Sequence, residues 1–303
     1  MIGGMEPDWT GVRGRILHAE PLARYTSWRV GGPADRLFVP ADDTDLSLFL
    51  SRLPDSEPLY WMGLGSNILV RDGGVRGTVI IVAGVLSELR IDAQNVLLVG
   101  AGVACAKAAR FVADNGLAGI EFLAGIPGTI GGALAMNAGA HGAEIWQRVL
   151  GVTIMNRHGR CAEHPAAEFR TGYRSVELSA GSWFVRARLQ LEPDPGGAAT
   201  SRIRDYLALR TRHQPTGKFS CGSVFKNPPG HFAGRLIEES GLKGLRVGQA
   251  SVSEKHANFI INEGGASAAD IEALIGLVQD AVSRKFFINL EPEVRLIGDS
   301  VEH

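Results

Sequence analysis

Apolar side chains recur along the chain at two spacings, one typical of helices and the other of strands. Helical spacing predicts a helix over 42–53, with Asp42, Asp43 or Thr44 as its N-cap, and a second over 103–115 that Gly116 closes. Further helices are predicted over 201–212 and 233–240, and a long one begins at the capping box formed by Ser267 and Asp270. Strands are predicted over the remaining apolar segments: 25–40 (two strands around a Gly-Gly turn), 59–65, 78–84, 89–102 and 149–164 (both hairpins), 183–193, 258–262 and 290–298.

One apolar stretch, residues 119–142, carries seven glycines in 24 residues. Glycine loses more backbone entropy on folding than any other residue, so this density indicates a backbone that turns sharply or lies close against something. Flexible linkers are glycine-rich but polar, whereas this stretch holds Phe122, Ile126 and Ile130 and is therefore predicted to be buried. We interpret it as a backbone cradle for a large, flat, partly anionic cofactor. A tightly packed structural corner is the alternative.

Composition excludes several classes of protein. The chain has 303 residues, is 45% hydrophobic and 21% charged, and has a net charge of −1, so nothing supports non-specific binding to nucleic acid or to a membrane surface. No apolar run reaches the roughly 18 residues of a membrane helix, and the N-terminus lacks the apolar core of a signal peptide. The cytoplasm is therefore expected. Cys105, Cys161 and Cys221 are far apart and fit neither a disulfide framework nor a zinc site, so no metal is expected.

The common nucleotide-binding motifs are not present. Gly100 and Gly102 are followed by Cys105 where the dinucleotide fingerprint needs its third glycine, and no P-loop occurs. The segment from Gly63 to Asn67 follows a predicted strand and offers consecutive N–H groups beside two polar side chains, an arrangement that binds phosphate oxygens. A plain turn explains this segment equally well by itself. Together with residues 119–142 it suggests two loops that clasp one dinucleotide.

A few polar residues offer candidate chemistry. Ser223 lies in a tight turn near Lys226, and a serine hydroxyl serves as a general acid only if its anion is stabilised; ordinary turn chemistry is the alternative. Glu293 on an apolar segment is either an edge charge or a site residue, and the Arg174 fork would suit a substrate carboxylate. The eight histidines show no metal-binding pattern, and a lone His256 is more often structural than a ligand. No G-x-S-x-G elbow occurs.

In combination these motifs resemble the UDP-N-acetylenolpyruvoylglucosamine reductase family over nearly the whole chain. The resemblance rests on YTSWRVGGPAD, LGSNILVRDGGVRG, GLAGIEFLAGIPGTIGGALAMNAGAHG, GYRS, SCGSVFKNP, AGRLIEESGLKG, SEKHANFIIN and LEPEVRLIG. It implies an α+β chain with a vanillyl-alcohol-oxidase (PCMH-type) FAD-binding fold and a separate C-terminal α+β substrate-binding domain. The expected divisions are a lead-in over 1–29, a two-lobed FAD-binding domain over 30–195 and the substrate domain over 200–303, joined by the Pro/Gly/Ser-rich stretch 193–201.

The resemblance also implies chemistry: non-covalent FAD, NADPH as reductant, and a UDP-sugar substrate in peptidoglycan synthesis. Ser223 would be the general acid that protonates the enolpyruvyl group, while Arg174 and Glu293 would polarise the substrate carboxylate. A protonated Glu293 is needed if it donates, which burial would favour. Substrate contacts are expected from Tyr173, Lys226, Asn227, His256 and His213. FAD contacts are expected from Gly63, Gly65, Ser66, Asn67, Gly125, Ile126, Pro127, Gly128, Gly131, Gly132, Asn137 and Gly139.

Three features depart from the family pattern. SVELS follows Arg174 where the family has x-Ser-x-Phe-Lys, and His213 stands where a lysine is common. The short segment after Arg174 resembles the family branch without an extra tyrosine-bearing loop. Two rival interpretations remain: an FAD-dependent oxidase of the same fold class, which covalent flavin would favour, and a nucleotide-sugar-binding protein without activity, which a colourless protein would favour. No nucleic-acid or membrane partner is expected, and a monomer is favoured.

Overall fold

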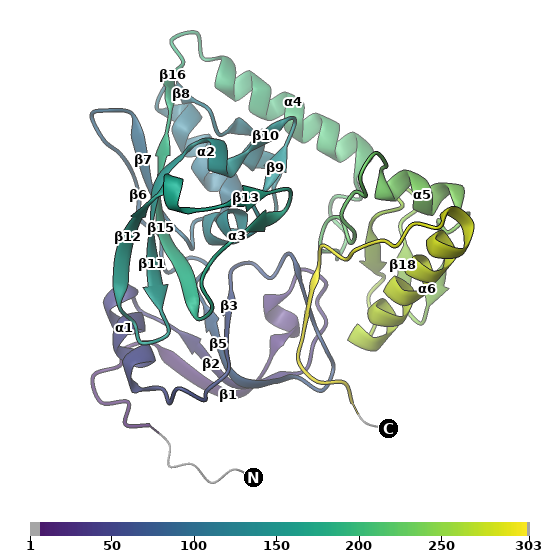
Figure 1. Ribbon diagram of the computed structural model, residues 1–303, viewed down its shortest axis with the longest axis horizontal. Helices are drawn as coiled ribbons and strands as arrows, with labels where there is room; N and C mark the ends of the chain where they lie inside the picture. Colours follow the sequence, from purple (N-terminus) through teal and green to yellow (C-terminus); the bar gives the residue numbers. More distant parts are fainter. Residues whose placement is uncertain (1–6, 302–303) are drawn as a thin grey trace. The chain divides into compact units, whose positions relative to one another are not determined.

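The computed structural model describes residues 7–301, so the first six residues of the predicted lead-in and the last two residues of the chain lie outside the description. Two compact units are present, and each is assembled from separate stretches of sequence (Figure 1). The first contains the N-terminal residues up to His18 with Arg36–Gly63 and Gly77–Ile203. The second contains Ala19–Asp35, Leu64–Arg76 and the residues from Arg204 onward. The predicted domain limits stay predictions.

The first unit is built around a five-stranded antiparallel sheet in the order β12–β11–β15–β7–β6. Its strands are β6 (Leu89–Ile91), β7 (Val96–Gly100), β11 (Val149–Asn156), β12 (Cys161–Pro165) and β15 (Ser182–Gln190). Both predicted hairpins are therefore confirmed. The turn of the first has Asn95 at a φ of 58°, a left-handed conformation that asparagine tolerates better than most residues.

A second sheet, in the order β1–β2–β5–β3, supplies much of the apolar core below helix α1. The strands are β1 (Arg15–Pro21), β2 (Pro33–Val39), β3 (Leu59–Met62) and β5 (Val75–Ile81), and α1 spans Asp43–Arg52. Asp42 caps α1 by accepting a hydrogen bond from the Asp45 N–H, as its sequence position predicts. Phe38 and Phe49 stack with ring centroids 3.8 Å apart, and this contact joins α1 to the sheet.

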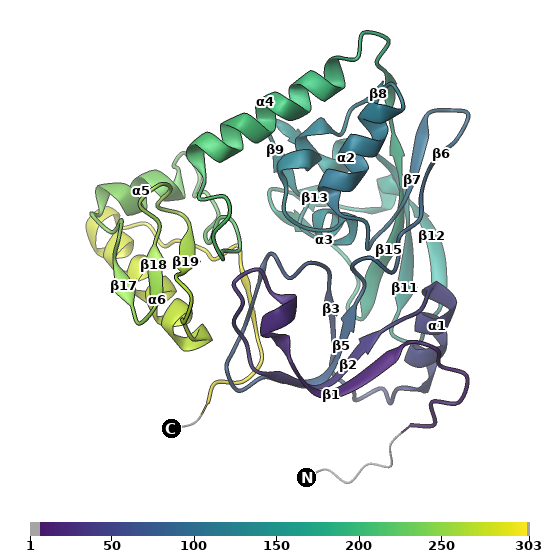
Figure 2. The same cartoon turned by 180° about the vertical axis from the view of Figure 1, so that it is seen from behind.

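Short elements between β7 and β15, together with β16 after β15, also belong to this unit. They are α2 (Cys105–Asp114), β8 (Leu117–Ala118), the 3-10 helix η2 (Glu121–Gly125), α3 (Ile130–Ala135), β9 (Gly139–Ala140), β10 (Ala143–Glu144), η3 (Ile145–Gln147), η4 (Ala166–Glu168), β13 (Thr171–Gly172), β14 (Ser175–Val176) and β16 (Glu192–Pro193). Helix α3 lies against β7 and β15, as seen from behind in Figure 2. The predicted helix ending at Gly116 is confirmed as α2, and Gly116 has a φ of 69°.

The second unit packs helices α5 and α6 with a three-stranded sheet, β17–β18–β19. Its elements are η1 (Leu22–Tyr25), β4 (Ile68–Val70), α5 (Ala233–Glu239), β17 (Arg246–Val247), β18 (Ala250–Val252), β19 (Ile260–Asn262), α6 (Ala268–Phe286) and β20 (Arg295–Ile297). Helix α6 begins with the predicted capping box, and Asp72 adds a second cap by accepting from the N–H groups of Ala268 and Ala269, each at 2.9 Å. The fully buried Trp28 donates its indole N–H to the Ile260 carbonyl oxygen at 2.8 Å, which ties the N-terminal stretch into this core.

Three predicted segments are wrong in detail. The first half of 25–40 is not a strand, because a short helix and the turn closed by Thr26 Oγ1 donating to the Val30 carbonyl bring Trp28 into the core. The final strand covers only Arg295–Ile297. The stretch 193–201 is not wholly a linker, since helix α4 (Ala198–His213) begins within it and Asp194 accepts from the N–H groups of its first two residues.

Two absences hold for residues 7–301. None of the helices there combines the length and the apolar character needed to cross a membrane, and no group of three or more His, Cys, Asp or Glu side chains could hold a metal ion. Cys105, Cys161 and Cys221 are free thiols, and burial raises the pKa of Cys105 to about 12.

Candidate functional site

The glycine-rich stretch has a buried face and an open face, so it is only partly buried. Phe122, Leu123, Ile130 and Leu134 lie in the core, whereas Pro127 and Gly132 are exposed and Gly125, Ile126, Gly128 and Gly131 are half-buried. Thr129 caps α3 by accepting from the Gly132 N–H. The apolar side chains thus hold the stretch against the protein, and largely bare backbone remains on its outer side.

Close packing explains some of the glycines but not all of them. A Cβ on Gly63 would lie 2.4 Å from Thr129 Oγ1, and one on Gly131 would lie 2.8 Å from the Cβ of Ala101, so neither position has room for a side chain. Gly139 is equally restricted, because its Cβ would lie 2.6 Å from the Ala143 carbonyl oxygen. Gly132 differs, since a Cβ there would meet nothing closer than 3.9 Å. Packing therefore explains Gly63, and the structural-corner interpretation explains Gly131 and Gly139, whereas neither explains Gly132.

This open backbone face fits a flat cofactor that must approach the main chain closely. Gly63 at the end of β3 lies directly beside Thr129, so within the first unit the two predicted loops meet at this point. The glycines leave the outer face without side chains, and the α3 cap orients N–H groups at its edge. The residues present are consistent with FAD held here by backbone contacts.

The other part of the predicted phosphate loop belongs to the second unit. Gly65 has a φ of 60°, and a Cβ there would lie 2.0 Å from the Tyr25 carbonyl oxygen, so only glycine fits. Ser66 is half-buried. Asn67 donates from Nδ2 to the backbone carbonyl of Glu293 at 3.0 Å, and its own carbonyl accepts from the Arg295 N–H at 3.0 Å. The loop is therefore joined to the segment that carries Glu293.

Tyr173 and Arg174 form the turn of a two-residue hairpin between β13 and β14. Arg174 has a φ of 54°, an uncommon conformation for a side chain of this size that is enriched at functional sites. Its guanidinium donates to the Gly139 carbonyl at 3.1 Å and lies over the Tyr173 ring. Asn137, 1% exposed, donates to Glu144 and to the Gly172 carbonyl at 3.0 Å. The hairpin is thereby fixed to residues 137–140, and the Asn137 side chain is occupied inside the protein.

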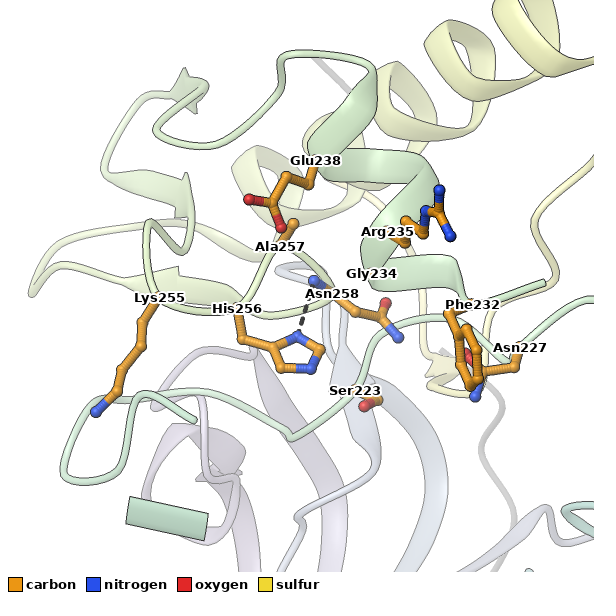
Figure 3. Close-up of a pocket in the computed structure, with 10 residues that line it drawn as sticks. All are labelled: Ser223, Asn227, Phe232, Gly234, Arg235, Glu238, Lys255, His256, Ala257 and Asn258. Atoms are coloured by element: carbon orange, nitrogen blue, oxygen red, sulfur yellow. Dashed lines mark hydrogen bonds between the residues drawn. The ribbon is translucent and has the colours of Figure 1, made fainter. Parts of the chain in front are cut away.

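A pocket of about 370 Å³ lies wholly in the second unit (Figure 3). Three predicted site residues line it: Ser223 from the loop after Cys221, Asn227, and His256 from the turn before β19. The other lining residues are Phe232, Gly234, Arg235, Glu238, Lys255, Ala257 and Asn258. A hydroxyl, an imidazole, two amides, two cations and one carboxylate line this pocket, and they suit a polar ligand that carries hydroxyl groups.

His256 is held closely in this pocket. Its Nδ1 accepts a hydrogen bond from the Asn258 N–H at 3.2 Å, and a Cβ on Gly234 would lie 3.0 Å from its Cε1. Burial lowers the pKa of His256, and Lys243 and His213 lower it further while Glu238 opposes them. His213, exposed at the end of α4, therefore lies near enough to influence the pocket.

Glu293 is brought next to Ser223 through the backbone, because its N–H donates to the Val224 carbonyl at 2.8 Å. Lys226 is directed elsewhere and pairs with Glu291. Asn227 accepts from the Ala233 N–H at 3.0 Å and so also holds the start of α5. Arg174 and the glycine-rich stretch belong to the first unit, whereas Ser223, Glu293, Asn227, His256 and His213 belong to the second.

Sequence reasoning missed Phe232, Arg235, Glu238, Lys255 and Asn258. A signal for two of them was present, because Arg235 and Glu238 lie three residues apart on the predicted helix 233–240 and share a face with Gly234. Asn258 gave no such signal. The sequence pattern places it only as the first residue of a predicted strand, although its side chain hydrogen-bonds the backbone of Phe225, 33 residues earlier.

Comparisons with known proteins agree on both units. Residues 214–297 match the model of the UDP-N-acetylenolpyruvoylglucosamine reductase C-terminal domain, and residues 34–163 match an FAD-binding domain. A reductase of that name from Alkalilimnicola ehrlichii is 57% identical, covering 95% of this chain and 96% of the relative. One from Legionella pneumophila is 56% identical, covering 99% of this chain and 98% of the relative. Among solved structures, the enzyme from Thermus caldophilus superposes with a TM-score of 0.80 at 36% identity, covering 94% of this chain and 99% of that one.

Proposed function

The chain belongs to the UDP-N-acetylenolpyruvoylglucosamine reductase family and is an FAD-containing oxidoreductase with that family's fold, and from this premise we propose that it reduces the enolpyruvyl ether of UDP-N-acetylglucosamine to UDP-N-acetylmuramate, a step of peptidoglycan synthesis, with NADPH as reductant. Because both substrates are nucleotides of the cell interior, we place the reaction in the cytoplasm. The backbone of the glycine-rich stretch would hold FAD without a covalent bond, and the cofactor would supply there the hydride for the methylene carbon of the enolpyruvyl group.

Ser223 completes the reduction by giving its hydroxyl proton to the neighbouring carbon, so that hydride and proton together saturate the C=C bond. The observation that carries this assignment is the shared pocket of Ser223, Asn227 and His256, with the Glu293 backbone hydrogen-bonded to the residue after Ser223. A serine alkoxide needs donors around it, and the pocket is lined by such groups. Asn227 and His256 donate to the oxygens of the UDP-sugar.

Arg174 and a protonated Glu293 act on the substrate carboxylate, where negative charge develops during hydride transfer. Donors already oriented towards that charge contribute most to the rate, because they need no reorganisation in the transition state. Arg174 is pre-oriented by its strained turn and its bond to Gly139. His213, at the end of α4, is assigned to contact with the substrate diphosphate, where a lysine is common in the family. Tyr173 and Lys226 are also assigned to substrate binding.

The test is an anaerobic absorbance titration of the purified holoprotein. NADPH should bleach the flavin band, and the enolpyruvyl UDP-sugar should restore it. Ser223→Ala should keep the bleaching by NADPH and lose about 10²- to 10⁴-fold in the rate of restoration, the range expected for removal of a general acid. Ser220→Ala, a serine of the same loop outside the pocket lining, is the control. Restoration by oxygen alone would contradict the proposal, as would unchanged kinetics in Ser223→Ala.

A further inference from the structure

Asn258 uses all four of its hydrogen-bonding groups to join two parts of the pocket. It is 3% exposed. Its side chain accepts from the Phe225 N–H at 3.0 Å and donates to the Phe225 carbonyl at 2.8 Å. Its backbone carbonyl accepts from the Val224 N–H at 2.9 Å, and its backbone N–H donates to His256 Nδ1 at 3.2 Å. No single one of these bonds marks a site, but together they connect His256 to the residues that follow Ser223.

The bond to His256 determines where that imidazole carries its proton. A ring nitrogen that accepts a hydrogen bond from a backbone N–H is unprotonated, so the neutral ring holds its proton on Nε2. Figure 3 shows this second nitrogen on the side of the ring towards Ser223. Protonation of Nδ1 would set two N–H groups against each other. Asn258 therefore presents His256 to the pocket as a neutral Nε2–H donor.

The charged and titratable groups around His256 favour the same state. Lys243 and His213 disfavour the imidazolium, Glu238 on α5 favours it, and burial, the largest effect, disfavours it. Lys255 on the same turn is directed to the Thr211 carbonyl, to which its ammonium donates at 2.6 Å. Gly234 admits the ring at its observed position. Glu238 and the hydrogen bond of the ring with its own backbone both favour the imidazolium, but burial is the larger effect and the pKa of His256 is lowered.

The same residue sets the position of Ser223. Three hydrogen bonds run in series: Asn258 N–H to His256 Nδ1, Val224 N–H to the Asn258 carbonyl, and Glu293 N–H to the Val224 carbonyl. Ser223 directly precedes Val224, so its backbone cannot shift without disturbing this series. The two side-chain bonds to Phe225 lock the register from the other side.

We propose that Asn258 is a positioning residue that holds His256 as its Nε2–H tautomer and, through residues 224 and 225, fixes Ser223 relative to both His256 and Glu293. The effect of Asn258 on the reaction rate rests on the proposed function, and the tautomer of His256 does not. Misplacing a reacting group by about 1 Å can reduce a rate about 10²-fold. Loss of the Asn258 side chain should therefore act mainly on kcat for the UDP-sugar half-reaction.

The first measurement is 15N NMR of the wild-type holoprotein with labelled histidine, assigned with His256→Gln. The Nε2–H tautomer of His256 is expected, and the Nδ1–H tautomer would overturn the proposal. Asn258→Ala keeps the backbone N–H that donates to His256 Nδ1 but loses the two side-chain bonds to Phe225 that hold residue 258 in place. The bond to Nδ1 should therefore loosen, giving a mixture of tautomers and a kcat lower by about 10- to 100-fold, with a smaller change in KM. Asn258→Asp keeps the shape and the bond from Phe225 N–H but cannot donate to the Phe225 carbonyl, and it serves the same purpose if Asn258→Ala does not fold.

The chain supplies a matched control in Asn262, a second buried asparagine four residues later. Its side chain donates to the Trp28 carbonyl at 2.9 Å and accepts from the N–H groups of 264, 265 and 266, away from the pocket. Asn262→Ala should lower Tm but leave kcat and the His256 signals unchanged. If the Asn258 variants behave in the same way, Asn258 is merely structural and the proposal fails. If the wild-type flavin is not reoxidised by the UDP-sugar, the proposed function fails, and the NMR comparison still decides the tautomer.

Discussion

Adjacent glycines at the start of α3 give opposite predictions when each is changed to alanine. In Gly131→Ala the new Cβ would lie 2.8 Å from the Ala101 Cβ and 3.2 Å from the Ala101 carbonyl, well inside ordinary contact distance. Overpacking of this kind costs about 1–3 kcal/mol of unfolding free energy. In Gly132→Ala the Cβ meets no atom closer than 3.9 Å, so the helix gains about 0.5–1 kcal/mol from alanine's higher propensity.

The effect of Gly132→Ala on FAD affinity should be opposite in sign to its effect on stability. If the outer face of residue 132 lies against FAD, a methyl there holds the cofactor off the backbone, and we expect its Kd to rise at least about tenfold, or about 1.4 kcal/mol. The FAD-free Gly132→Ala protein would then be more stable than FAD-free wild type, yet it would bind FAD more weakly than wild type does. Few substitutions separate these two properties, because most act on both.

The assay compares wild type, Gly131→Ala and Gly132→Ala after removal of FAD. Thermal unfolding of the deflavinated proteins gives the stability order, and titration with FAD followed by flavin fluorescence gives the three Kd values. A Gly132→Ala protein that binds FAD like wild type would refute the cradle interpretation at this position. A destabilised Gly132→Ala protein would contradict the conclusion that a Cβ at residue 132 meets open space.

Further predictions concern the second unit. Trp28→Ala removes a fully buried indole and its bond to the Ile260 carbonyl, and it should reduce the unfolding free energy by about 3–5 kcal/mol in urea; a loss below 1 kcal/mol would contradict the role of Trp28 in this core. Asp72→Ala should cost about 1 kcal/mol by the same assay, because two N–H groups of α6 lose their cap, and Asp72→Asn should retain part of it. The pKa of His256 is lower in the folded than in the unfolded protein, so the unfolded protein takes up the proton first as pH falls. The contribution of neutral His256 to the unfolding free energy is therefore complete above about pH 6.5 and is lost as pH falls from there through the folded pKa. Urea unfolding between pH 5 and 8 should show this loss in wild type and not in His256→Gln.

Local patterns in the sequence predict most of the regular elements correctly. The caps of α1 and α6 depend on residues within three positions of each other, so the sequence contains the whole interaction. The same is true of the glycine after α2 and of both hairpins. One of the failures has a long-range cause. The strand predicted near 25 is replaced by a turn because Trp28 packs against β19, more than 200 residues away.

In the candidate site, too, some residues can be identified from the sequence and others only from the fold. Ser223, Asn227 and His256 could be chosen from motifs, because each lies in a stretch of distinctive residues, and the pocket does bring them together. Nothing in the motifs distinguishes the two parts of the glycine-rich stretch. Distances to Thr129 and Ala101 show that Gly63 and Gly131 are required by packing, whereas Gly132 is not.

The helices, the hairpins, the family resemblance and the candidate proton donor follow from the amino-acid sequence, because each depends on residues close together in the chain or on motifs read in order. The long-range polar contacts that hold these elements in place follow from the fold. Asn258 reaches back to Phe225, and Asp72 caps a helix 196 residues further on. A buried amide or carboxylate must find a partner wherever the fold brings one, and that partner's distance along the chain leaves no periodic trace in the sequence.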